Sequence, residues 1–190
     1  MEFLGLTLKE LTEVVAQNPS LRGMILGYAA EVKLRSMWFS DPKKISKAVK
    51  YDDHNREKPG DLVVTYKGED FVIECKSLQT KMCRKLDDGT FVGKAQVDAS
   101  DRRKLKLPNG SRIETTCLLT GEFDILAVNL FAFENKWRFI FARNEDLPRT
   151  TFKGYTRKQR QYLLATLVEV SWPPQPPFVD NPFILLDQMV

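Results

Sequence analysis

The 190-residue sequence is poor in histidine and cysteine, with one histidine and three cysteines. Cys75, Cys83 and Cys117 are too few and too scattered for a disulfide framework or for a zinc site with paired cysteines. The single histidine, His54, lies in a charged stretch that is typical of a solvated loop. The sequence therefore disfavours hydrolases that depend on a histidine base.

Long apolar runs are also missing. No stretch approaches the roughly 18 apolar residues of a transmembrane helix, and the first residues lack the charged and apolar regions of a signal peptide. We therefore expect a cytoplasmic protein with no membrane contact. A hydrophobic content of 43% is ordinary for a globular chain, and we predict one domain over residues 1–170 with an arm over residues 171–190.

The chain has little net charge overall, but one segment is strongly basic. The net charge is only +4. Residues 76–106 contain nine lysines and arginines against four aspartates, a local net charge of +5. A basic segment of this kind indicates either a polyanionic partner or a solvated loop rich in lysine and arginine.

The first part of the chain shows helical patterns. Thr7 and Glu10 form a capping box that predicts a helix over residues 8–17. A second helix is expected over residues 20–38, ending before Asp41-Pro42. Its inner face is predicted from apolar residues at helical spacing: Leu21, Met24, Ile25, Tyr28 and Val32.

Strand patterns follow. We expect a strand over residues 45–51 and a hairpin formed by residues 61–66 and 71–76 around a glycine-containing turn. Residues 77–109 are a hairpin or a loop. Three further strands are expected as a meander, over residues 112–119, 123–133 and 137–142. A helix is expected after them, over residues 156–166.

The last 20 residues contain Trp172-Pro173-Pro174-Gln175-Pro176-Pro177, which is incompatible with a helix or a central strand. We expect an extended arm that lays the apolar residues 183–186 on the body. The whole pattern predicts the α/β class, with a central mixed sheet flanked by helices.

Asp61, Glu74 and Lys76 carry the strongest chemical signal. Glu74 and Lys76 are two residues apart on one expected strand, so they point to the same face, and the hairpin register would bring Asp61 close to Glu74. Two neighbouring carboxylates repel each other unless a cation lies between them. Mg²⁺ prefers oxygen ligands and uses one or two carboxylates plus phosphate oxygens, and a lysine would stabilise negative charge on a reacting phosphate.

Each of these residues also has a structural reading. Asp61 after Pro59-Gly60 would suit a turn. Glu74 and Lys76 would suit an ordinary ion pair on a solvated strand.

The pattern Pro-Gly-Asp followed 13 residues later by Glu-Cys-Lys resembles the PD-(D/E)XK nuclease superfamily, over roughly residues 20–130. The resemblance implies a restriction-endonuclease-like core. It implies Asp61 and Glu74 as ligands of Mg²⁺ (or Mn²⁺), with the Cys75 backbone carbonyl completing the set, and Lys76 as the catalytic lysine. It also implies Glu31 as an acid on the preceding helix, although Glu31 would equally suit a surface pair with Arg35.

Other residues are candidates for contacts with nucleic acid. Arg102, Arg103 and Lys104 are suited to phosphate contacts, which dominate affinity without reading sequence. Gln96, with Lys94 beside it, would reach a phosphate or a metal-bound water, or would hold its loop together.

We therefore expect a Mg²⁺-dependent endodeoxyribonuclease of a restriction or defence type acting on DNA, and the resemblance implies a homodimer. The alternatives are a Holliday-junction resolvase, a non-cleaving nucleic-acid-binding module on the same fold, and an interaction protein that docks a partner through residues 172–177.

Overall fold

The computed structural model describes residues 4–50 and 60–190, so the expectation for His54 lies outside the described residues. The centre is a five-stranded sheet in the order β1-β2-β3-β8-β9. β3 and β8 run parallel, and the other neighbours are antiparallel. These strands are β1 (Ile45–Val49), β2 (Leu62–Tyr66), β3 (Glu69–Ser77), β8 (Ile125–Asn129) and β9 (Phe139–Arg143).

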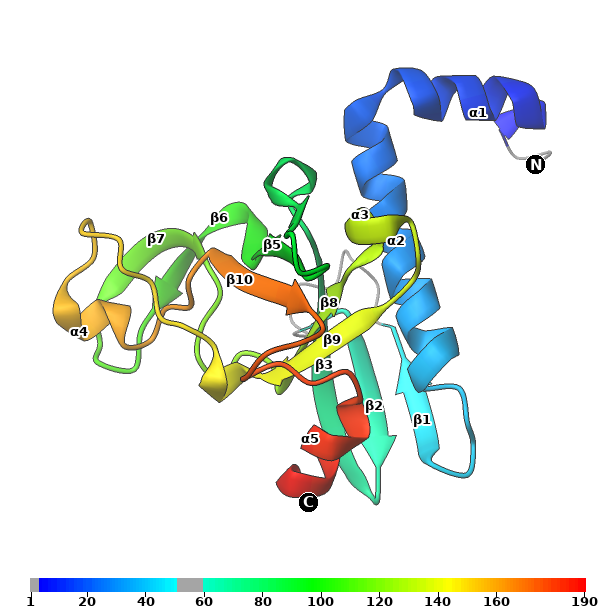
Figure 1. Ribbon diagram of the computed structural model, residues 1–190. Coiled ribbons are helices and arrows are strands. Elements are labelled where there is room, and N and C mark those ends of the chain that lie inside the picture. The colour runs from blue at the N-terminus through cyan, green and yellow to red at the C-terminus, as the bar shows by residue number, and fades with distance from the viewer. Residues whose placement is uncertain (1–3, 51–59) are drawn as a thin grey trace.

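Helices cover one face of this sheet (Figure 1). Ala30 and Leu34 from α2 and Leu185 and Leu186 from α5 are buried in one core with strand residues such as Ile73. The α/β class and the central mixed sheet flanked by helices are therefore confirmed. The helices are α1 (Leu8–Gln17), α2 (Pro19–Trp38), α3 (Phe131–Glu134), α4 (Arg157–Arg160) and α5 (Pro182–Met189), with 3₁₀ helices at Thr80–Met82 and Asn144–Asp146.

A second, smaller sheet covers the other face. It has the order β10-β5-β4, formed by β10 (Leu167–Trp172), β5 (Phe91–Gln96) and β4 (Arg84–Lys85). Its buried Ala95, Val168 and Val170 pack with Leu126 and Val128 of β8. The candidate residues of β3 therefore lie between two sheets at the strand end.

A separate lobe forms from β6 (Asp98–Lys106), β7 (Arg112–Cys117) and the segment around α4 (Figure 1). A small apolar cluster holds it together, with Leu107, Cys117 and Leu163 buried at its centre. The hydroxyls of Thr115 and Tyr155, 2.6 Å apart, join the hairpin to the α4 segment.

The helix predictions over residues 8–17 and 20–38 are confirmed, including the capping box of Thr7 and Glu10. The predicted inner face of the second helix is wrong. Met24, Ile25, Tyr28 and Val32 are 41–67% exposed, whereas Ala30 and Leu34 are buried. The first half of α2 projects with α1 beyond the body (Figure 1), which leaves Met24, Ile25 and Tyr28 exposed. In the second half, Ala30 and Leu34 are buried in the core and Val32 is not.

The hairpin over residues 61–76 is confirmed, with Leu62 opposite Ile73. The expected three-strand meander is wrong, because β7 pairs with β6 and β8 pairs with both β3 and β9. Residues 77–109, left open as a hairpin or loop, contain β4, β5 and β6. The pairing of β3 with β8 joins segments that are distant in sequence, which local patterns do not encode.

The predicted helix over residues 156–166 is only four residues long, because Leu163 and Leu164 form β-bridges with Leu119 and Arg149. In the predicted C-terminal arm, residues 183–186 pack on the body as expected, with Leu185 and Leu186 buried. These residues form part of helix α5 and are not extended. β10 runs through position 170, so the predicted boundary falls inside a strand. Within the described ranges, no helix is long and apolar enough to cross a membrane.

Candidate active site

The β2–β3 register places Asp61 beside the end of β3. The Asp61 backbone N–H donates to the Ile73 carbonyl at 3.0 Å, which extends the ladder one residue beyond Leu62. The Asp61 carboxylate then accepts from the Cys75 N–H at 2.7 Å. This short bond fixes the carboxylate along β3, next to the positions of Glu74 and Lys76.

Gly60 makes this approach feasible. Its φ of +75° lies in the left-handed region, and a Cβ there would stand 2.3 Å from Cγ1 of Val72 and 3.2 Å from the Ile73 carbonyl oxygen. Only glycine fits such a position without displacement. The glycine between Pro59 and Asp61 is therefore what allows the chain to enter β2 with Asp61 against β3.

Glu74 and Lys76 share the face of β3 that meets the smaller sheet. Their neighbours across the parallel pair are Leu126 and Val128, both fully buried. The Lys76 Nζ and a Glu74 carboxylate oxygen form an ion pair at 2.7 Å, with side-chain exposures of 21% and 12%. The prediction that these two side chains emerge together from an apolar frame is confirmed.

This environment shifts the protonation of both groups. Burial raises the pKa of Glu74 from 4.5 to about 7, because the charge of Asp61 adds to the desolvation while Lys76 opposes it. Burial acts to lower the pKa of Lys76, but the charge and hydrogen bond of Glu74, with Asp61 and Asp98, outweigh it and raise that pKa. The site thus holds a cationic lysine beside a carboxylate that is costly to ionise.

Cys75 is not an activated nucleophile. Burial, together with the negative charges of Asp61, Glu31 and Glu74, raises the pKa of its thiol well above the ordinary value. A reactive cysteine requires the opposite shift.

Glu31 approaches the site from the helix side of the sheet. It forms an ion pair with Lys50 at 2.5 Å, and Lys50 lies 4.6 Å from the ring centre of Tyr28. Glu31, Lys50, Asp61 and Cys75 line one cavity of about 150 Å³. The alternative reading of Glu31 as a partner of Arg35 is not what the described contacts show.

The predicted catalytic residues therefore form two groups, one on each side of the sheet near Asp61. Glu74 and Lys76 lie on one side of the sheet, and Glu31 lies on the other side with Lys50. Among residues 4–50 and 60–190, no three acidic, histidine or cysteine side chains are grouped closely enough to hold a metal ion. Sequence reasoning missed Lys50, whose only signal was its place at the end of the strand over residues 45–51.

Gln96 and Lys94 lie on β5 at the edge of this region. Gln96 hydrogen-bonds with Gln79 and donates from Nε2 to Asp98 at 3.3 Å. The negative charge of Asp98 also helps to raise the pKa of Lys76. Gln96 has the loop-holding contacts that were one of its two expected roles.

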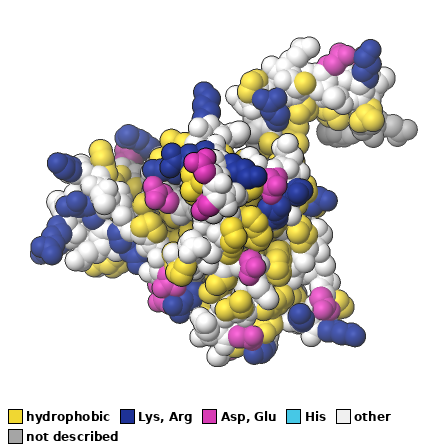
Figure 2. All heavy atoms as spheres, in the orientation of Figure 1, with side chains coloured by type: hydrophobic (Ala, Val, Ile, Leu, Met, Phe, Trp, Pro, Cys, Tyr) yellow, Lys and Arg dark blue, Asp and Glu magenta, His cyan; other side chains and the backbone are white. Residues whose placement is uncertain are grey.

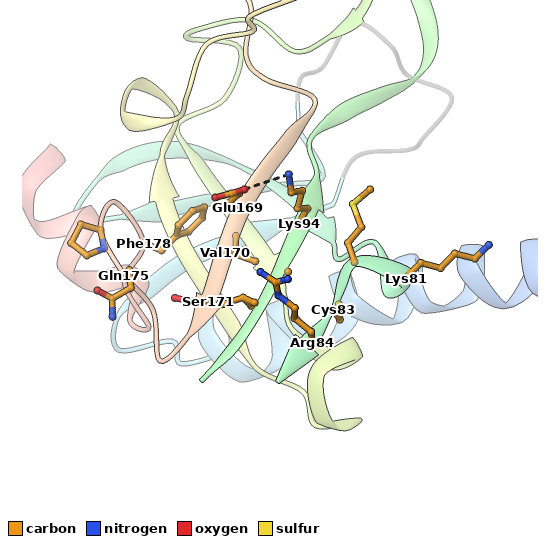
Figure 3. A pocket seen from close by; sticks show the side chains of 13 residues that line it. Lys81, Cys83, Arg84, Lys94, Glu169, Val170, Ser171, Gln175 and Phe178 are labelled. Carbon is orange, nitrogen blue, oxygen red and sulfur yellow. Dashed lines mark ion pairs between the residues drawn. The ribbon is translucent and has the colours of Figure 1, made fainter. Parts of the chain in front are cut away.

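Lys94 lies in a groove of about 710 Å³ that runs over the smaller sheet (Figure 3). Its ammonium group pairs with Glu169 of β10 at 3.3 Å. Lys81 and Arg84 also line the groove, so three cations face one carboxylate there.

The three basic residues of β6 differ in their surroundings. Arg103 is half-buried, pairs with Glu122 and donates from NH2 to the Cys117 carbonyl at 3.1 Å, which favours a structural role. Arg102 and Lys104 are exposed. They therefore retain the accessibility that phosphate contacts need.

No family model and no curated protein matches this chain. A comparison with solved structures finds the bacterial homing endonuclease I-Ssp6803I at 15% sequence identity and a TM-score of 0.34, covering 73% of this chain and 84% of that one. A likeness at this level does not establish a shared fold.

Proposed function

We propose that this protein is a metal-dependent endonuclease that hydrolyses phosphodiester bonds in DNA, with Asp61, Glu74 and Lys76 as its active site. The observation that carries the proposal is the pairing of a buried carboxylate, Glu74, with a second carboxylate and a lysine at one strand end. A buried cluster of this kind is unfavourable as a structural element and is suited to chemistry on an anionic substrate.

The residues fit a divalent cation. Burial and the negative charge of Asp61 both raise the pKa of Glu74, and a cation near both carboxylates would remove this cost. Asp61, Glu74 and the Cys75 carbonyl would hold Mg²⁺ or Mn²⁺, which suits an ion that takes one or two carboxylates and keeps several waters. Such an ion supplies Lewis acidity to a phosphoryl oxygen and lowers the pKa of a bound water.

Lys76 supplies positive charge at the reacting phosphate. Its raised pKa keeps the ammonium protonated at neutral pH. A fixed cation in a partly buried site stabilises negative charge that develops in the transition state far better than one in water. The pair with Glu74 holds Lys76 in place before the substrate binds.

The basic lobe supports DNA as the partner. Residues 147–168 contain five lysines and arginines and no acidic residue, and Lys153, Arg157 and Lys158 are exposed. The hairpin beside them adds Arg102 and Lys104. Figure 2 shows dark blue side chains over the lobe at the left. A surface on which cations outnumber carboxylates is suited to the phosphate backbone.

We assign a restriction or defence type to this enzyme because the lobe and the groove over the smaller sheet add surface beyond the catalytic end of β3. A Holliday-junction resolvase is the alternative within the nuclease class. A non-cleaving DNA-binding module is the alternative outside it.

The test is cleavage of supercoiled plasmid and of branched DNA with Mg²⁺ or Mn²⁺, beside EDTA. We expect metal-dependent products that disappear in Asp61→Ala and Lys76→Ala. The matched control is Glu69→Gln, an exposed carboxylate on the same strand, which should cut as the wild type does.

The products discriminate between the alternatives. Double-strand breaks in plasmid indicate a restriction-type enzyme, and cuts confined to the branched substrate indicate a resolvase. Salt-sensitive binding to every substrate with no products would reject the enzyme in favour of the binding module.

A further inference from the structure

The N-terminal helices carry apolar side chains that are not buried against the described body. We call α1 and the first half of α2, residues 8–28, the helical arm. No side chain of the arm is buried among the described residues. On α2, an apolar stripe is exposed at Met24 (60%) and Ile25 (41%).

α1 has a matching apolar row. Leu8 and Val14 are 66% and 38% exposed, and Leu11 and Val15, three and seven residues after Leu8, are partly exposed. Figures 1 and 2 show the arm projecting from the body, with yellow side chains on its surface. Soluble monomers rarely present a contiguous apolar surface of this kind.

The arm also has too little support to be stable alone. Isolated helices shorter than about 12–15 residues are marginal in water, and most helices owe their stability to the packing of an apolar face. α1 has 10 residues. The apolar faces of the arm therefore need cover from outside the described chain.

We propose that a second copy of this chain provides that cover, with α1 of each copy packed across the apolar stripe of α2 of the other. Charge complementarity supports this occupant. α1 contains two glutamates and one lysine, a net charge of −1, whereas α2 contains Arg22, Lys33 and Arg35 against one glutamate, a net charge of +2.

The same charges select the geometry. Pairing α2 with α2 would bring positive surfaces together, which is unfavourable. Pairing α1 with α2 brings Glu13 of one copy toward the basic flank of α2 of the other. An isologous contact of this kind occurs twice about a two-fold axis and closes the assembly as a dimer.

The first test is the mass of the full chain in solution, by sedimentation and light scattering. We expect a dimer at micromolar concentration, and at least a tenfold weaker association in Met24→Glu and Ile25→Glu, since an unpaired charge in an apolar contact is poorly tolerated. Both substitutions are at exposed positions, so the body should keep its thermal stability. Ile184→Glu on α5, at 45% exposure, is the matched control and should remain a dimer.

The second test exchanges charges. One variant carries Glu13→Lys, and another carries Arg22→Glu and Lys33→Glu. In a homodimer of either variant, α1 and α2 carry like charges at both contacts, so each variant should dimerise more weakly than the wild type. An equimolar mixture pairs opposite charges at both contacts and should form a heterodimer that is tighter than either homodimer.

A monomeric wild type with an intact helical signal would overturn the proposal. So would dimers that persist in Met24→Glu and Ile25→Glu, because the contact would then lie elsewhere. The measured quantities are mass and association, so neither outcome depends on whether the protein cleaves DNA.

Discussion

Two regions of this molecule hold side chains in an environment that does not suit them. At the end of β3, Glu74 is buried although it is a carboxylate. In the helical arm, Met24 and Leu8 are exposed although they are apolar. Each mismatch costs stability in the isolated chain. Each mismatch motivates one of the two proposals: a bound divalent cation for the first region and a second copy of the chain for the second.

The end of β3 and the helical arm differ in where their partners come from. The buried charges are brought together by the register of one hairpin within a single copy. The apolar side chains of the helical arm are exposed in the described chain, and we propose that a second copy covers them.

The largest effect is expected at Lys76. Lys76→Met removes the positive charge beside the reacting phosphate, and loss of one such group costs about 100-fold to 1,000-fold in rate. Single-turnover cleavage rates at saturating metal measure this. Binding of DNA should change little, and a normal rate in a folded Lys76→Met variant would remove lysine from the mechanism.

The two halves of α2 should respond differently to truncation. Leu34 is fully buried over the sheet, so Leu34→Ala should lower the free energy of unfolding by about 2–5 kcal/mol. Met24→Ala in the arm should change the stability of the body by less than about 0.5 kcal/mol. Urea unfolding of both variants tests this, and equal losses would show that the arm packs on its own body.

The stability of the metal-free protein should depend on pH through Glu74. Because its pKa is raised to about 7 in the folded state, protonation stabilises the fold, and this contribution is fully present below about pH 4.5 and lost as pH rises through 7. The loss is up to about 3 kcal/mol by the relation of pKa shift to free energy. Urea unfolding across this range in EDTA should show the fall, and Glu74→Gln should flatten it.

Divalent metal gives the complementary measurement. Mg²⁺ or Mn²⁺ should restore stability above pH 7 in the wild type and have little effect on Glu74→Gln. Identical pH profiles for the wild type and Glu74→Gln in EDTA would show that the buried carboxylate carries no such cost.

Gly60→Ala should disturb the entry of the chain into β2. A positive φ costs a non-glycine residue roughly 1–2 kcal/mol, and the new Cβ would also press on Val72. We expect a loss of stability of this size, and a larger loss of cleavage because Asp61 moves from Cys75. Gly68→Ala, also at positive φ but with open space around it, should lose similar stability and keep cleavage.

The smallest effects are expected in the basic lobe. Arg157→Gln and Lys158→Gln should each weaken DNA binding about equally for all sequences, and each should reduce the salt slope by about 1. Salt titrations of binding measure this. Lys47→Gln on β1, exposed and outside the lobe, is the control and should leave the slope unchanged.

The arrangement of Asp61, Glu74 and Lys76 was largely predictable because it depends on local geometry. Alternation along β3 fixes the common face of Glu74 and Lys76, and a short hairpin fixes the position of Asp61. The capping box of α1 was equally local. The central sheet could be foreseen as a class, but the parallel pairing of β3 with β8 joins residues 73–77 to residues 125–129 and leaves no local trace.

The missed features share a cause. Lys50, which follows β1, pairs with Glu31 of α2, and β-bridges at Leu163 and Leu164 replace the expected helix after Arg160. For α2, periodicity correctly marked an apolar face, yet it could not say whether that face meets this chain or another. Amphipathic spacing predicts that a surface will be covered and not what covers it.

The most direct test of the central claim is to measure Mn²⁺ binding and plasmid nicking on the same samples of wild type and Asp61→Asn. The account predicts that the metal concentration for half-saturation matches that for half-maximal nicking in the wild type. Both should be lost together in Asp61→Asn. Nicking that persists in EDTA or in a folded Asp61→Asn variant would contradict the assignment of this site.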